Sequence, residues 1–229
     1  MLRTFGFLVI SFLFIESPAN AQNFSYTLQK DSADYVPLAE KTTLIEGASF
    51  VNRHFTIHLP FTFNFCGSTT DSVVIQTNGF VVFDVTKKLS LISFNSFGGN
   101  KDSTNAFVSS INYSIEGTTG NRILKIEFKN LSLGSFTYRD NLSYQIWVYE
   151  NGNSLEYHVG SNYLSSLQDS EFPVLLGAIN QNMDTDNKAF LISGNPSSPS
   201  SQIISSGNDL VYVNSMPSIG TIYKLTPSN

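Results

Sequence analysis

The chain has 229 residues, of which 13 are Lys or Arg and 18 are Asp or Glu, so its formal net charge is −5. Binding to nucleic-acid phosphates needs clustered basic side chains, and this balance excludes a strongly basic nucleic-acid surface. Hydrophobic residues make up 41% of the chain, which is enough apolar surface to bury a core and argues against disorder. A single cysteine excludes a disulfide framework within the chain and a Cys-rich zinc module.

Residues 1–21 have the pattern of a cleaved secretory signal peptide. Arg3 precedes an 11-residue apolar run, Phe5–Ile15, and Ala19-Asn20-Ala21 supplies the small residues that signal peptidase accepts. As a helix this run would rise only about 16 Å, well short of the roughly 30 Å hydrocarbon core of a bilayer. We therefore expect an exported product, residues 22–229, without a membrane span, that is secreted or stays in the periplasm or cell envelope.

The mature chain is dominated by short segments in which apolar and polar residues alternate. A period of two is typical of β-strands that bury one face. The predicted strands are Phe55–Leu59, Phe61–Phe65, Val73–Gln76, Phe80–Val85, Leu89–Phe94, Phe107–Ile115, Ile123–Phe128, Tyr144–Tyr149, Leu155–Val159, Val174–Ile179, Ala189–Ile192, Leu210–Val213 and Thr221–Leu225.

Turn residues separate these segments, and no convincing amphipathic helix follows residue 21. Asn151-Gly152, for example, predicts a tight hairpin between Tyr144–Tyr149 and Leu155–Val159. The sequence therefore predicts one all-β domain over residues 22–229, an antiparallel two-sheet β-sandwich of jelly-roll-like type with about 12–14 strands. The Ser- and Pro-rich stretch 193–207 is predicted to be a long surface loop.

Several of these segments also carry sequence motifs. Leu59–Gly67 reads LPFTFNFCG and Val73–Phe83 reads VVIQTNGFVVF, which resembles the opening of nidogen-like domains and of Bacteroidetes-type secreted β-sandwich modules. The blocks YSIEG at Tyr113–Gly117, Asn121-Arg122 and QIWVYE at Gln145–Glu150 resemble later motifs of the same modules. The resemblance implies a β-sandwich and no particular activity, since such modules occur in adhesins and as accessories of enzymes.

One stretch has the spacing of a calcium loop. Asn180, Asn182, Asp184 and Asp186 place oxygen-bearing side chains at every second residue, as a hard cation requires. The bidentate Glu that should close such a loop is missing, because the twelfth position from Asn182 is Ser193. A polar hairpin turn is the favoured interpretation, so we expect no cofactor, and a calcium-stabilised structural module is the alternative.

The histidines and the cysteine suggest little chemistry. A three-histidine zinc site would need His54, His58 and His158 to converge, although each is simply explained as an outward-facing strand position. Cys66 is predicted to be a small buried hydrophobe in a Phe-rich strand rather than a nucleophile.

Four carboxylates are candidates for the acid and base of a glycoside hydrolase, namely Glu116, Glu127, Glu150 and Glu156. Ordinary surface charge explains them as well, because Glu127 alternates with apolar neighbours as an exposed residue does. We also expect Glu116 to pair with Arg122 across the turn between their strands. An enzyme is therefore the alternative hypothesis and not the leading one.

Aromatic side chains outside the alternating pattern are the candidates for ligand binding. Phe136, Tyr138 and Tyr163 lie in polar surroundings, where a ring can stack on a sugar while Asn, Asp and Gln bind its hydroxyls. The leading hypothesis is an exported binding or structural module that recognises carbohydrate or a protein partner. The sequence leaves the oligomeric state open.

Overall fold

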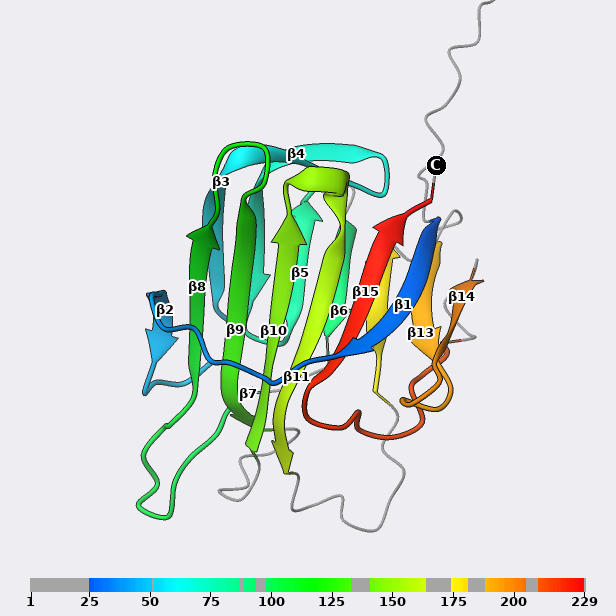
Figure 1. Cartoon of the computed structure of the whole chain (residues 1–229). Coiled ribbons are helices and arrows are strands. Elements are labelled where there is room, and N and C mark those ends of the chain that lie inside the picture. Colours follow the sequence, from blue (N-terminus) through cyan, green and yellow to red (C-terminus); the bar gives the residue numbers. More distant parts are fainter. Residues whose placement is uncertain are drawn as a thin grey trace, which may run out of the picture.

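The structure is a computed structural model that describes residues 25–50, 52–86, 89–93, 98–132, 141–163, 174–180, 188–204 and 210–228. Its strands form two antiparallel sheets that pack face to face (Figure 1). The predicted all-β, two-sheet sandwich is thereby confirmed.

Sheet A has the strand order β1-β15-β11-β10-β9-β8-β2, and the short strand β7 also pairs with β9. Its strands are β1 (Tyr26–Ser32), β2 (Thr42–Glu46), β7 (Gly98–Gly99), β8 (Ser110–Glu116), β9 (Ile123–Ser132), β10 (Asn141–Tyr149), β11 (Leu155–Tyr163) and β15 (Thr221–Pro227). A single turn of 3-10 helix, Asn151–Asn153, closes the predicted hairpin between β10 and β11.

Sheet B has the order β14-β13-β12-β6-β5-β4-β3. Its strands are β3 (His54–Phe65), β4 (Ser68–Gln76), β5 (Phe80–Asp84), β6 (Leu89–Ser93), β12 (Leu176–Asn180), β13 (Ala189–Ser193) and β14 (Ser200–Ile204).

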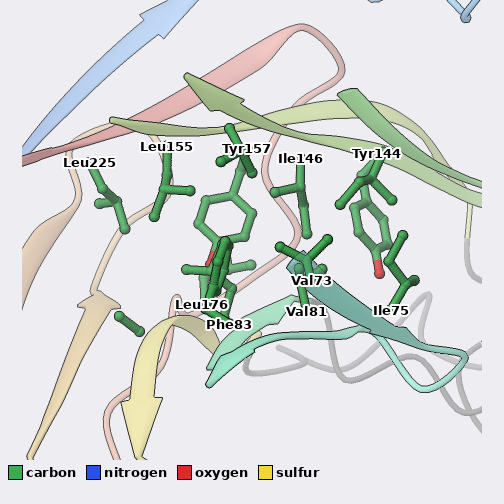
Figure 2. Packing of buried hydrophobic residues seen from close by; sticks show 14 of the residues in the cluster. Val73, Ile75, Val81, Phe83, Tyr144, Ile146, Leu155, Tyr157, Leu176 and Leu225 are labelled. Atoms are coloured by element: carbon green, nitrogen blue, oxygen red, sulfur yellow. The ribbon is translucent and has the colours of Figure 1, made fainter. Parts of the chain in front are cut away.

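The core lies between the sheets and follows the alternation seen in the sequence. Tyr144 and Tyr157 of sheet A are fully buried and point toward sheet B, where side chains such as Val73 and Phe83 meet them (Figure 2). The Tyr157 hydroxyl donates a hydrogen bond to the Gly177 carbonyl at 3.1 Å, so this polar group is not buried without a partner.

The strands differ from the predicted ones in places where pairing overrides composition. β3 runs without a break through Pro60, which an edge strand tolerates because one side of its backbone is unpaired. β14 lies inside the stretch predicted to be a loop, because pairing with β13 outweighs the weak strand preference of its serines. Leu210–Val213, predicted as a strand, makes only isolated bridges through Val213.

Cys66 is buried, as predicted, with 2% of its surface exposed. Its thiol lies 3.7 Å from the Tyr26 hydroxyl, and burial raises the pKa of Cys66 to about 12. A thiol with so high a pKa is almost entirely protonated at neutral pH and is a poor nucleophile.

The predicted pairing of Glu116 with Arg122 is wrong. Glu116 pairs with Lys125 at 2.6 Å, because the register of β8 and β9 sets both side chains on the outer face of sheet A. Arg122 instead pairs with Glu150 at 2.6 Å, and its Nε donates to the second carboxylate oxygen at 2.8 Å. This two-point contact fastens the β8–β9 turn to the end of β10.

The Arg122–Glu150 contact predicts a pH-dependent stability. The hydrogen bonds from Arg122 hold the pKa of Glu150 at about 2, against an ordinary value of 4.5. A carboxyl whose pKa is lower in the folded state stabilises the fold above its unfolded pKa, and this stabilisation is lost as the pH falls through its folded pKa. We expect Glu150→Gln to lower the Tm at neutral pH, and the difference from wild type to shrink between pH 4.5 and about 2.

Thermal unfolding followed by circular dichroism over a pH series measures this difference. Glu46→Gln, at an exposed position on β2, is the matched control and should leave the Tm nearly unchanged. A difference that stays constant down to pH 2 would show that the ion pair is not its source.

Candidate functional site on the outer face of sheet A

A short connection crosses the outer face of sheet A. β1 and β2 are the two opposite edges of this sheet, and residues 33–41, here called the strap, join them. Six steps between neighbouring strands separate β1 from β2, or about 29 Å, whereas the ten chain steps from Ser32 to Thr42 reach at most about 33–36 Å. The strap therefore has little slack and runs almost straight across the strands (Figure 1).

Beneath the strap lies a carboxylate with no exposed surface, Glu127 of β9. Its Oε1 accepts hydrogen bonds from the Tyr35 hydroxyl at 3.1 Å, the Leu38 amide at 3.2 Å and the Gln145 amide at 3.1 Å, and Oε2 accepts one from Asn112 at 3.4 Å. A buried carboxylate is costly unless donors surround it, and two of these four donors belong to the strap.

The prediction that Glu127 is an exposed surface charge is therefore wrong. Alternation correctly places its side chain on the outer face, between the buried Ile126 and Phe128. The covering segment, however, comes from about 90 residues earlier in the chain, as the separation of 92 between Tyr35 and Glu127 shows.

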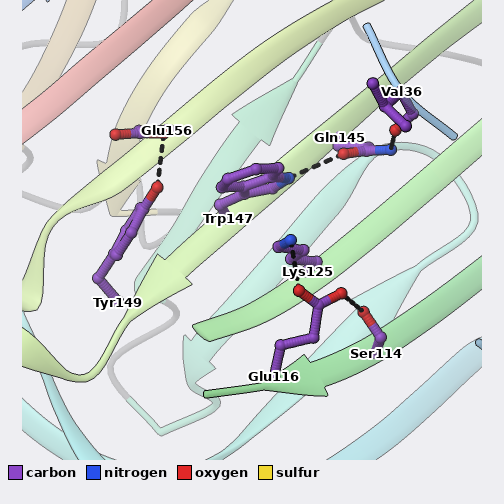
Figure 3. A network of polar contacts seen from close by, with 8 residues as sticks. All are labelled: Val36, Ser114, Glu116, Lys125, Gln145, Trp147, Tyr149 and Glu156. Atoms are coloured by element: carbon purple, nitrogen blue, oxygen red, sulfur yellow. Dashed lines mark hydrogen bonds and ion pairs between the residues drawn. The ribbon is translucent and has the colours of Figure 1, made fainter. Parts of the chain in front are cut away.

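A second contact to the strap comes from β10. The Gln145 amide donates to the Val36 carbonyl at 2.9 Å, and the Gln145 carbonyl oxygen accepts from the Trp147 indole at 2.8 Å (Figure 3). The indole N–H thus fixes the orientation of the amide group that holds the strap.

Trp147 belongs to a polar and aromatic band on the part of sheet A that the strap leaves open. The Lys125 ammonium lies 4.1 Å from the centroid of its ring, and the His158 ring stacks on it with centroids 3.9 Å apart. Lys125 is on β9 and His158 on β11, the two neighbours of β10, so they bracket the indole from both sides. Neither face of the indole is left open for a ligand ring.

The other half of this band is built around Glu156. Its Oε2 accepts from the Tyr149 hydroxyl at 2.7 Å and contacts His158 Nε2 at 2.8 Å, and its Oε1 lies 3.2 Å from the Lys224 ammonium. Burial opposes ionisation, but the hydrogen bonds from His158 and Tyr149 outweigh it and lower the pKa of Glu156. The carboxylate is ionised and occupied by its own neighbours.

Each of the four carboxylates considered for glycoside hydrolysis is bound by neighbouring side chains. Glu116 pairs with Lys125, and Glu156 contacts Tyr149, His158 and Lys224. Glu127 lies under the strap, and Glu150 is clamped by Arg122.

On the other side of the strap, the outer face ends in a cluster around Tyr163. This side chain is 53% exposed, and Asn141 lies directly opposite it on β10. The Ser161 hydroxyl donates to Asn141 Oδ1 at 2.9 Å and lies within hydrogen-bond distance of the Ser143 hydroxyl, at 3.1 Å. We call Asn141, Ser143, Ser161 and Tyr163 the Tyr163 cluster.

Two β-bulges shape the backbone at this cluster. The register shifts between Leu142 and Tyr144 on both sides of β10, toward β9 and toward β11. Ser143 is the residue of β10 at which both shifts occur. Its hydroxyl accepts a hydrogen bond from the Asn130 amide at 3.1 Å. Bulges redirect side chains and bend strands, and they often border binding sites.

The remaining predicted site residues are only partly located. Phe136 and Tyr138 lie outside the described residues, as do Asn182, Asp184 and Asp186 of the predicted calcium loop, whereas the backbone of Asn180 ends β12. The three histidines do not converge, because His54 and His58 are on β3 of sheet B and His158 is on sheet A. Within the described residues, no three acidic, His or Cys side chains gather as metal ligands would.

Tyr163 is exposed, as its polar sequence context predicts, whereas the network around the strap was not predicted. Alternation places Glu127, Gln145, Trp147, Glu156 and His158 on outward positions, which is the signal that was available. Their contacts depend on the register of three neighbouring strands and on the path of the strap, and neither can be read from a period of two.

A shallow hollow of about 330 Å³ opens where the strap leaves β1, lined by Ser32, Ala33, Asp34, Tyr35, Ile219 and Gly220. Ile219 in its lining is 62% exposed, and Val36, which follows Tyr35 in the chain, is 70% exposed. The volume is at the lower end of the roughly 300–1,000 Å³ found for small-molecule pockets.

A family model described as NIDO related matches residues 25–227 of the 229-residue chain. This match confirms the nidogen-like resemblance predicted from the motifs. Comparisons with curated proteins and with solved structures gave no match. No helix in the described parts of the chain is long and apolar enough to cross a membrane.

The contact between the strap and Glu127 predicts a stability loss. Tyr35→Phe removes one donor from the buried carboxylate, and we expect it to lower the free energy of unfolding by about 1–3 kcal/mol. Urea denaturation measures the change. Tyr113→Phe on the neighbouring strand β8 is the matched control and should cost less. Equal losses for the two variants would contradict a specific role of the Tyr35 hydroxyl.

Proposed function

The chain belongs to the NIDO-related family, and on that premise we propose that it is an exported binding module that recognises carbohydrate through the Tyr163 cluster. The family is of the extracellular type of binding or structural module. The signal-peptide pattern of residues 1–21 supports export to the cell envelope or beyond.

The observation that carries this proposal is the exposed ring of Tyr163 next to the hydroxyl and amide groups of Asn141, Ser143 and Ser161. An aromatic ring offers an apolar surface to the C–H groups of a pyranose, and Tyr keeps a polar end for solvent or ligand. Ligand sites combine such a surface with a few convergent polar groups that fix orientation. The Tyr163 cluster has both parts.

The band around Trp147 suits this task less well. Lys125 and His158 already bracket its indole, and the Glu156 carboxylate is bound by Tyr149, His158 and Lys224. A sugar would have to displace these contacts before it could stack. We therefore assign the band to holding the strap and the sheet together.

The other two aromatic candidates from the sequence, Phe136 and Tyr138, lie outside the described residues, so the proposal rests on Tyr163 and its described neighbours.

A glycan array probed with purified residues 22–229 tests the proposal. We expect binding that Tyr163→Ala reduces about tenfold, because an aromatic contact contributes on the order of 0.5–1.5 kcal/mol beyond the area it buries, and about 1.4 kcal/mol is tenfold in affinity. The array is run with calcium and again with a chelator. Binding that only the chelator abolishes would assign recognition to the calcium loop over residues 180–187 instead.

Val85→Ala is the matched control, because Val85 is 67% exposed and follows a strand of sheet B. It should bind as wild type does, and circular dichroism should show that both variants are folded. Failure of the folded wild-type protein to bind any glycan would contradict the proposal and shift the search to protein partners.

A further inference from the structure

Each sheet of the sandwich ends in two edge strands, β1 and β2 in sheet A and β14 and β3 in sheet B. The outer side of an edge strand carries backbone N–H and C=O groups that can pair with another chain. Proteins discourage such pairing with charged side chains, with proline or with charges that point inward.

Three of these edges carry such protection. β1 has exposed Lys30 and Asp31, and Lys30 lies opposite the buried Tyr223, so its charge points toward the core side of the sheet. β2 ends in the exposed Glu46, and β3 contains Pro60.

The fourth edge, β14, has none of these features. Its sequence, SSQII over Ser200–Ile204, contains no charged residue and no proline, and four of its five residues are exposed. Ile203 lies opposite Phe190, whose ring contacts Tyr26 of sheet A with centroids 5.6 Å apart, so Ile203 is on the core side of the sheet. Ile203 is nevertheless 54% exposed. It points to the core side from an edge strand, as Lys30 does on β1, but it carries no charge.

We propose that β14 is a self-association edge that pairs antiparallel with β14 of a second copy of the chain, so that the two B sheets join into one continuous sheet. A two-fold axis at Gln202 sets Gln202 opposite its own copy, Ser201 opposite Ile203 and Ser200 opposite Ile204. No charge meets a like charge in this register, and the same strand serves as both halves of the interface.

The two-fold arrangement also covers the exposed isoleucine. The two copies of Ile203 become diagonal neighbours on the same face of the joined sheet, within reach of each other. The interface is small, since five residues on each side fall short of the roughly 1,000 Å² expected of a stable complex. The dimer is therefore weak and depends on concentration.

Sedimentation equilibrium of residues 22–229 over a concentration series tests the proposal. Wild type should fit a monomer–dimer equilibrium, and Ile203→Lys should raise the dimer Kd at least about tenfold, because two like charges become diagonal neighbours. Ile219→Lys is the matched control: Ile219 is similarly exposed, at 62%, but lies in the loop before β15, and this variant should keep the wild-type Kd.

A cysteine variant tests the register independently. Gln202→Cys places a thiol opposite its own copy and should form a covalent dimer under mild oxidation, whereas Val85→Cys should not. The native Cys66 is buried and does not compete. A wild type that stays monomeric at every concentration, equal weakening by the two lysine variants, or equal cross-linking of the two cysteine variants would each overturn the proposal.

Discussion

The limited length of the strap is the constraint on which the outer face of sheet A depends. β1 pairs with the C-terminal strand β15 at one edge of the sheet, and β2 pairs with β8 at the other. A connection that barely spans this distance has to lie flat on the strands between them. It therefore covers the middle of the face and divides the remainder into the band around Trp147 and the Tyr163 cluster.

The side chains under the strap form hydrogen bonds with it. A carboxylate at the crossing point would be an exposed charge on a bare sheet, whereas under the strap it becomes the acceptor for the Tyr35 hydroxyl and the Leu38 amide. Gln145 links this contact to the Trp147 indole. The polar groups of the band thus support the strap. Ligand recognition is proposed at the Tyr163 cluster because the Tyr163 ring is exposed, whereas Lys125 and His158 lie against the Trp147 ring.

Alternation in the sequence predicted the sandwich and the face of most strand residues. Tyr144 and Tyr157 are buried, and His158 points outward, as a period of two requires. The sequence could not predict that Glu127 is covered or that Glu116 pairs with Lys125, because both depend on the pairing of strands far apart or on register. β14 was missed because its serines carry no strand signal until β13 pairs with them.

The candidate site was predicted less completely than the fold. Tyr163 could be singled out because an aromatic residue in a polar context breaks the core pattern, and it is indeed exposed. Its neighbours Asn141, Ser143 and Ser161 gave no such signal, since small polar residues are common in any loop or edge. Their convergence comes from the bulges on both sides of Ser143.

The measurement that tests the strap most directly is hydrogen exchange on two length variants. Deleting Ala39 and Glu40 shortens the maximum reach of the connection to about 26–29 Å, which is at or below the roughly 29 Å between β1 and β2. Inserting Gly-Ser at the same place lengthens the connection. If the strap is barely long enough, the deletion should pull β1 or β2 out of the sheet and expose its amides to exchange. The insertion should leave both strands protected. Wild-type protection of β1 and β2 in the deletion variant would contradict it.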